Sequence, residues 1–177
     1  MPEQLHIPRA KITPPRLAVP LLPRPRLHDA VRSGAERRLV VLSAEAGYGK
    51  TALLLSVLPA LDLPTAWVTL DPADADLNLF AAAVAASVAR VAPDVPALVD
   101  RLLTTGPNPS DVRALLLRLF DDAPPLVVIL DDFHTVEHNP EVLDLVDALL
   151  AHLPAHLHII LATRTWPRLG SLPRLLV

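Results

Sequence analysis

Short apolar runs alternate with longer segments of helical period along this chain. Four of the runs have the length and composition of strands buried on both faces of a parallel sheet. They cover Leu39–Leu42, Ala66–Leu70, Leu126–Leu130 and His158–Ala162. Because strands that alternate with helices favour parallel pairing, the pattern predicts an α/β fold with a mainly parallel sheet.

The helical segments between these runs carry start and stop signals. The clearest begins at Asn139-Pro140, a capping residue followed by proline, and keeps its apolar residues on one face until Pro154 ends it. Residues 1–25 contain seven prolines and no helical period, so we expect an extended Pro/Arg-rich arm there and one domain over 26–177. The other expected helices cover Leu27–Ser33, Lys50–Leu58, Asp76–Val91, Val95–Leu103 and Ser110–Phe120.

The strongest functional motif follows the first apolar run. Residues 44–51 read Ala-Glu-Ala-Gly-Tyr-Gly-Lys-Thr between an expected strand and a leucine-rich helix, which is the context of a phosphate-binding P-loop. In such a loop the backbone N–H groups surround a triphosphate, Lys50 reaches its β- and γ-phosphates, and the Thr51 hydroxyl ligates Mg²⁺. The predicted nucleotide-binding residues of this segment are Ala44, Glu45, Ala46, Gly47, Tyr48, Gly49, Lys50, Thr51 and Ala52.

Composition strengthens this interpretation of the loop. The chain has 5 glycines, two of which are Gly47 and Gly49, and Lys50 is one of only two lysines among 16 basic residues. A lysine kept at this position in an arginine-rich chain is informative, because a compact ammonium suits a phosphate. The first loop position is Ala44 where the strict motif has glycine, and alanine is tolerated there if its φ is negative.

Charge and cysteine content exclude several classes of protein. The net charge is −3, with +5 over residues 1–38 and −8 over the remainder. No aromatic residues interleave with the basic ones, so we expect a solvated arm and no direct DNA binding. The absence of cysteine excludes disulfides and cysteine-based metal sites and, without a signal peptide, favours a cytoplasmic protein. No apolar run approaches the ~20 residues of a membrane helix, so no membrane partner is expected.

A second motif closes the third apolar run. Asp131 and Asp132 follow Leu126–Leu130 directly, about eighty residues after Lys50, in the manner of a Walker B strand. The first acid can hold Mg²⁺, and the second can orient or deprotonate an attacking water. Neighbouring strand residues point to opposite faces, so we expect the two acids to divide these tasks. Arg164, just after the fourth run, is a candidate sensor of the γ-phosphate.

The histidines and the two tryptophans are expected to have structural roles and no role in chemistry. His134 and His138, like His152 and His156, are four residues apart, but a turn and Pro154 break the geometry that a zinc site requires. We therefore expect no metal binding by the histidines. We expect Trp67 and Trp166 to pack in the core or at strand ends.

Together these segments resemble a known family. They are Ser-Ala-Glu-Ala-Gly-Tyr-Gly-Lys-Thr (43–51), Trp-Val-Thr-Leu-Asp (67–71), Leu-Asp-Asp-Phe-His (130–134), Thr163-Arg164, and the entry motif Arg24-Pro25-Arg26-Leu27. In this order they are similar to the nucleotide-binding domain of MalT-like regulators. Those are large ATP-binding LuxR-type transcription activators of the STAND class of signal-transduction ATPases.

The resemblance implies a P-loop NTPase three-layer sandwich with sheet order 5-1-4-3-2, and ATP with Mg²⁺ as the ligand. It implies that Thr51 and Asp131 hold Mg²⁺, that Asp132, Lys50 and Arg164 are catalytic, and that Arg24 lies near the nucleotide. Family members continue past the point at which this chain ends, so we expect the fifth strand and the helical lid to be missing. The strand Leu39–Leu42 would then be an open edge, which predicts self-association or a protein partner.

Three functions remain open from the sequence. The first is an ATP/ADP switch domain of a regulator, with weak Mg²⁺-dependent ATP hydrolysis. The second is a non-hydrolysing nucleotide-binding or interaction remnant. The third is a small-molecule P-loop kinase, which the acid pair disfavours because it suits the activation of water.

Overall fold

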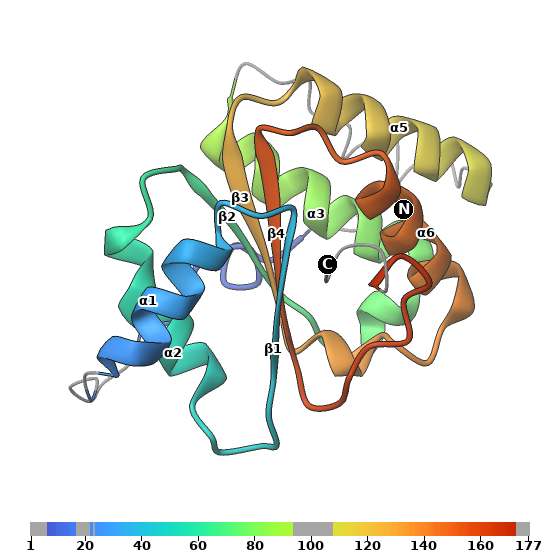
Figure 1. Ribbon diagram of the computed structural model, residues 1–177. Helices are drawn as coiled ribbons and strands as arrows, with labels where there is room; N and C mark the ends of the chain where they lie inside the picture. Colours follow the sequence, from blue (N-terminus) through green and yellow to red (C-terminus); the bar gives the residue numbers. More distant parts are fainter. Residues whose placement is uncertain (1–6, 17–21, 23, 94–107, 173–177) are drawn as a thin grey trace.

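A computed structural model describes residues 7–16, 22, 24–93 and 108–172 of the chain. Its centre is a sheet of four parallel strands in the order β1-β4-β3-β2 (Figure 1). The predicted α/β fold of the P-loop NTPase type with a parallel sheet is therefore confirmed. The strands are β1 (Leu39–Ser43), β2 (Thr65–Thr69), β3 (Leu126–Asp131) and β4 (Leu157–Thr163).

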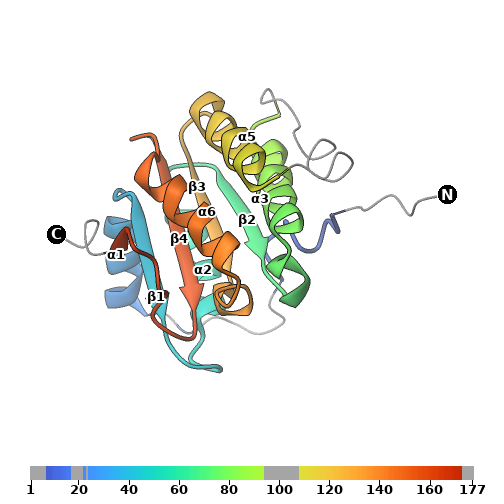
Figure 2. The same cartoon turned by 90° about the vertical axis from the view of Figure 1, so that its right-hand side faces the viewer.

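Helices cover both faces of this sheet. α1 and α2 lie on one face, and α3, α5 and α6 lie on the other (Figures 1 and 2). After β1 the chain crosses the whole sheet to β2 at the opposite edge. It then steps back across the sheet to β3 and next to β4, which lies beside β1. Right-handed crossovers therefore place the two sets of helices on opposite faces. The helices are α1 (Pro25–Gly34), α2 (Lys50–Val57), α3 (Leu77–Val91), α5 (Pro109–Asp122) and α6 (Pro140–Ala151), with the short 3₁₀ helices η1 (Leu58–Ala60), η2 (Pro72–Ala75) and η3 (Phe133–Thr135).

The strand side chains alternate between two apolar cores. Trp67, Ile129 and Ile160 pack toward α1 and α2, whereas Val68 and Val128 pack toward α3, α5 and α6. β3 is buried along its whole length, as its unbroken apolar run predicts. β1 was expected to be equally buried, but most of it is half-buried, because β4 is its only neighbour in the described part of the sheet.

The predicted helices are present with small differences in their bounds. Asp76, Asn108 and Asn139 accept hydrogen bonds from backbone N–H groups and cap α3, α5 and α6. The expected helix Val95–Leu103 lies outside the described residues. None of the described helices combines the length and apolarity that crossing a bilayer demands.

The described part of the N-terminal arm is not simply extended. Residues 8–13 form a turn, and the carbonyl of Lys11 accepts a hydrogen bond of 2.8 Å from Thr69 N at the edge of β2. The Lys11 ammonium bonds to Asp71 at 2.5 Å and to Asp74 at 2.7 Å. Those hydrogen bonds outweigh its burial and raise the pKa of Lys11. The arm thus covers the β2 edge, while the β1 edge lies at the other side of the sheet.

Candidate functional site

The P-loop lies at the carboxyl end of β1, where the sheet changes direction of winding. β1 leads to α2 on one face, while the segment after its neighbour β4 packs with Leu169 and Leu172 on the other face. In open α/β sheets, ligands bind in the crevice at such a point. The topology therefore makes this edge the candidate nucleotide site.

Two glycines give the loop its path from β1 into α2. Gly47 has φ +83° and Gly49 has φ +79°, values that favour glycine. A Cβ at Gly47 would contact nothing within 4 Å, so this glycine is needed for its backbone angle and not for space. Ala44 is not among the described residues with positive φ, which explains why alanine is tolerated at the first position.

Lys50, the first residue of α2, folds back over the loop. Its ammonium donates to the carbonyl of Ala44 at 2.6 Å and to that of Glu45 at 3.2 Å. Ala44 N in turn donates to Thr163 O at 3.2 Å, which ties the loop to the end of β4. The cation is thus held among the loop's own backbone atoms, while Ala46 and the Tyr48 side chain are exposed.

Thr51 and Asp131 meet although they are 80 residues apart. The Thr51 hydroxyl donates to Asp131 Oδ2 at 2.8 Å. Asp131 is 1% exposed, and burial raises its pKa, as does the neighbouring charge of Asp132, while the Thr51 hydrogen bond lowers it. A hydroxyl and a buried carboxylate side by side are hard oxygen ligands of the kind that Mg²⁺ prefers.

Asp132 lies outside β3, so the expectation that the two acids occupy opposite strand faces is wrong. Its φ of 57° turns the chain out of the strand, because the 3₁₀ helix η3 begins immediately after it. The turn is fixed by Asp132 N, which donates to Asp131 Oδ1 at 3.0 Å, and by Thr135 N, which donates to Asp132 O at 3.0 Å.

The end of β4 contributes Thr163 and Arg164 to the same edge. Thr163 is fully buried, yet its hydroxyl has no hydrogen-bond partner among the described residues. Buried hydroxyl groups are normally hydrogen-bonded, and a phosphate oxygen or a water molecule would supply the missing partner. Arg164 is exposed, and after burial its positive charge is the next cause that lowers the pKa of His134.

Arg24 reaches the loop from the residue before α1. Its guanidinium donates to Tyr48 O at 3.1 Å and lies 3.6 Å from the position that a Cβ of Gly49 would take. Ala52 borders the same point at 3.9 Å. The structure therefore brings the predicted entry residue onto the P-loop.

Two findings at this edge were not predicted. Lys11, Asp71 and Asp74 join the N-terminal arm to the end of β2, a contact between segments far apart in the sequence.

Trp166 is 55% exposed, so its expected packing role is wrong, whereas Trp67 is fully buried as predicted. Among the described residues, no group of three or more His, Cys, Asp or Glu could hold a metal ion.

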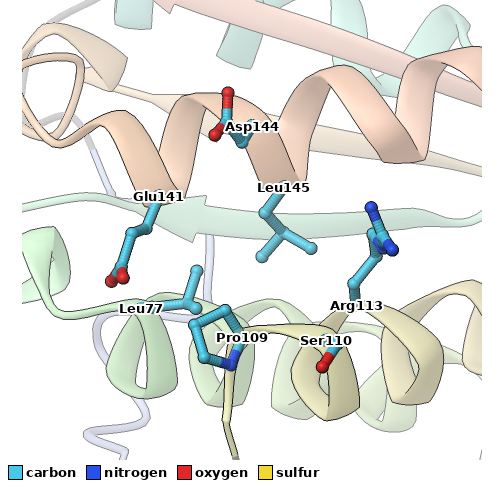
Figure 3. A pocket seen from close by; sticks show the side chains of 7 residues that line it. All are labelled: Leu77, Pro109, Ser110, Arg113, Glu141, Asp144 and Leu145. Atoms are coloured by element: carbon cyan, nitrogen blue, oxygen red, sulfur yellow. The ribbon is translucent and has the colours of Figure 1, made fainter.

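A surface pocket of about 310 Å³ lies elsewhere, where the first residues of α3 and α5 face α6 (Figure 3). None of the P-loop residues and neither acid of the pair lines it. Its lining residues are Leu77, Pro109, Ser110, Arg113, Glu141, Asp144 and Leu145.

The chain is similar to known proteins. The sequence profile described as "AAA ATPase domain" matches residues 25–161. HTH-type transcriptional regulator MalT is 29% identical over 151 residues in Klebsiella pneumoniae subsp. pneumoniae and also in Yersinia pestis (strain Pestoides F). Each alignment covers 83% of this chain and 16% of the relative, so the chain spans about a sixth of the curated relatives it matches. The resemblance to MalT-like nucleotide-binding domains is confirmed.

A chain of the structure of Drosophila ORC bound to AT-rich DNA and Cdc6 superposes with a TM-score of 0.48 and 12% identity, covering 85% of this chain and 50% of that one. A chain of the E. coli MS115-1 HORMA:CdnC:Trip13 complex gives 0.41 and 15%, covering 85% and 51%.

Proposed function

The chain belongs to the AAA ATPase domain family, and from this premise we propose that it is an ATP-binding switch domain of a MalT-related signal-transduction regulator, with slow Mg²⁺-dependent ATP hydrolysis. The observation that carries the proposal is the contact of Thr51 with Asp131 beside Lys50. A P-loop lysine, a helix-start hydroxyl and a strand-end carboxylate are the parts that bind a triphosphate with its metal.

The P-loop residues would bind the phosphates. Backbone N–H groups of residues 44–51 and the positive end of α2 favour an anion, and Lys50 adds a point charge. Arg24 lies close enough to the loop to contact the nucleotide. Thr51 and Asp131 would hold Mg²⁺, which when bound neutralises charge on the β- and γ-phosphates.

Asp132 and Arg164 would act on the attacking water and the γ-phosphate. The water oxygen bonds to the γ-phosphorus, the bond to ADP breaks, and the water proton passes to the Asp132 carboxylate. Arg164 stabilises the charge that develops on the transferred group. A non-hydrolysing ATP holder is the second candidate, favoured by the 40% exposure of the Asp132 side chain, which leaves its carboxylate open to bulk water.

Calorimetry with ATP and Mg²⁺ on the chain tests the binding step. Lys50→Ala removes a charge-assisted phosphate contact worth about 1.5–3 kcal/mol, so affinity should fall about tenfold to a hundredfold. Arg118→Ala, an exposed change on α5, is the matched control and should bind like the wild type. Equal affinity in Lys50→Ala and wild type would refute the proposal. Phosphate release then separates the hydrolysing switch from the passive holder.

A further inference from the structure

The turn after β3 holds Asp132 in an unusual conformation. Asp132 is the one non-glycine residue of the described chain with positive φ. Such conformations persist only where the surroundings hold them, and they are frequent at functional sites. Here Thr135 holds the turn twice, with its N–H and its hydroxyl both donating to Asp132 O at 3.0 and 2.9 Å.

This turn brings the ring of His134 beside the Asp132 carboxylate. Nδ1 of His134 lies 3.8 Å from Asp132 Oδ1 and is buried from solvent without a hydrogen-bond partner. A buried polar atom without a partner is unfavourable, so a small side-chain rotation that closes this gap is favoured. Hydrogen bonds at catalytic groups are often long before the substrate is bound and shorten afterwards.

The charges around the ring favour a neutral imidazole. Burial and the cation of Arg164 lower the pKa of His134, with a smaller contribution from Lys50, whereas Asp132 and Glu137 oppose them. One oxygen of Glu137, Oε1, accepts a hydrogen bond from the Thr165 hydroxyl, and no His134–Glu137 contact matches the approach of Nδ1 to Asp132 Oδ1 among the described residues. A neutral ring carries one N–H, and the carboxylate in front of Nδ1 selects the tautomer with the proton there.

We propose that His134 is a positioning residue, whose Nδ1–H donates to Asp132 Oδ1 and orients that carboxylate toward the attacking water. The inference rests on the proposed function for the role of Asp132. The contact between the ring and the carboxylate is independent of that role.

Variants of His134 in the full chain test the proposal. His134→Leu removes the donor and should lower the single-turnover rate of ATP hydrolysis at least about tenfold, while the affinity for ATP stays within about twofold. His134→Asn keeps an N–H near the position of Nδ1 and should retain most of the rate. His138→Leu, an exposed histidine four residues on, is the control. A wild-type rate in His134→Leu, or equal losses in the Leu and Asn variants, would overturn the proposal.

A second measurement decides the contact even if the chain proves not to hydrolyse ATP. ¹⁵N NMR of the histidine rings reports which nitrogen carries the proton. We expect the Nδ1–H form for His134 in the wild type and a shift toward Nε2–H in Asp132→Ala. Identical ring spectra in the two proteins would refute the contact. Equal ATP affinity in the wild type and Lys50→Ala would count against the proposed function and leave the ring result standing.

Discussion

Replacing Thr51 with valine tests the contact on which the candidate site depends. The substitution keeps the branched shape of the side chain and removes the hydroxyl that donates to Asp131 Oδ2 at 2.8 Å. Asp131 is 1% exposed, so solvent cannot replace the lost donor. A buried acceptor left unpaired costs about 1–3 kcal/mol. In a domain of this size each 1 kcal/mol lowers Tm by about 2–4 °C, so we expect a loss of about 2–12 °C without ligand.

The loss should depend on pH in a defined direction. Burial, as the largest cause, raises the pKa of Asp131 above 3.8, so the folded chain holds this proton more tightly than the unfolded chain. Stability therefore falls as pH rises from 3.8 through the pKa of the folded state. Thr51→Val removes a hydrogen bond that lowers the pKa of Asp131, so it raises that pKa further. The pH range over which the fold loses stability then becomes wider. The variant should thus lose most stability at neutral pH, and the difference should shrink as the carboxyl group is protonated.

Thermal unfolding followed by circular dichroism between about pH 5 and pH 8, without Mg²⁺ or nucleotide, measures both effects. Thr51→Ser keeps the hydroxyl and is the matched control, with an expected Tm close to that of the wild type. If Thr51→Val and Thr51→Ser unfold together at every pH, the hydroxyl does not stabilise Asp131 and the reasoning fails.

Three further predictions follow from other parts of the structure. Lys11→Met leaves the buried carboxylate of Asp74 without its cation and should cost about 3 kcal/mol in denaturant unfolding, whereas an unchanged midpoint would show that the ion pair does not stabilise the fold. Asp132→Asn should keep ATP affinity and abolish phosphate release, while Asp131→Asn should weaken Mg²⁺-dependent binding in calorimetry. Normal hydrolysis by Asp132→Asn would shift the water-activating role to another residue. The β1 edge should promote self-association at tens of micromolar, because the described arm lies at the β2 edge. A monodisperse monomer in light scattering would contradict this.

The sequence by itself determined the features that depend on neighbours along the chain. Continuous apolar runs predicted the strands, and cap-then-proline pairs predicted the starts of α5 and α6, because these signals act within a few residues. The P-loop was readable for the same reason, since its glycines, lysine and threonine form one local turn into α2. The sequence located Asp131 and Asp132 at the end of a strand but not their relative geometry. The chain turns at Asp132, so the alternation of side chains along a strand does not apply to this residue.

Only the tertiary structure decided which of these local features meet. The order β1-β4-β3-β2 brings Thr51 to Asp131 and Thr165, after β4, to Glu137, across separations that no local period encodes. The docking of Lys11 on β2 and of Arg24 on the P-loop arises in the same way. The physical reason is that apolar burial selects the sheet order and the helix layers as a whole. Polar contacts at the carboxyl edge then form between whichever strand ends that packing brings together.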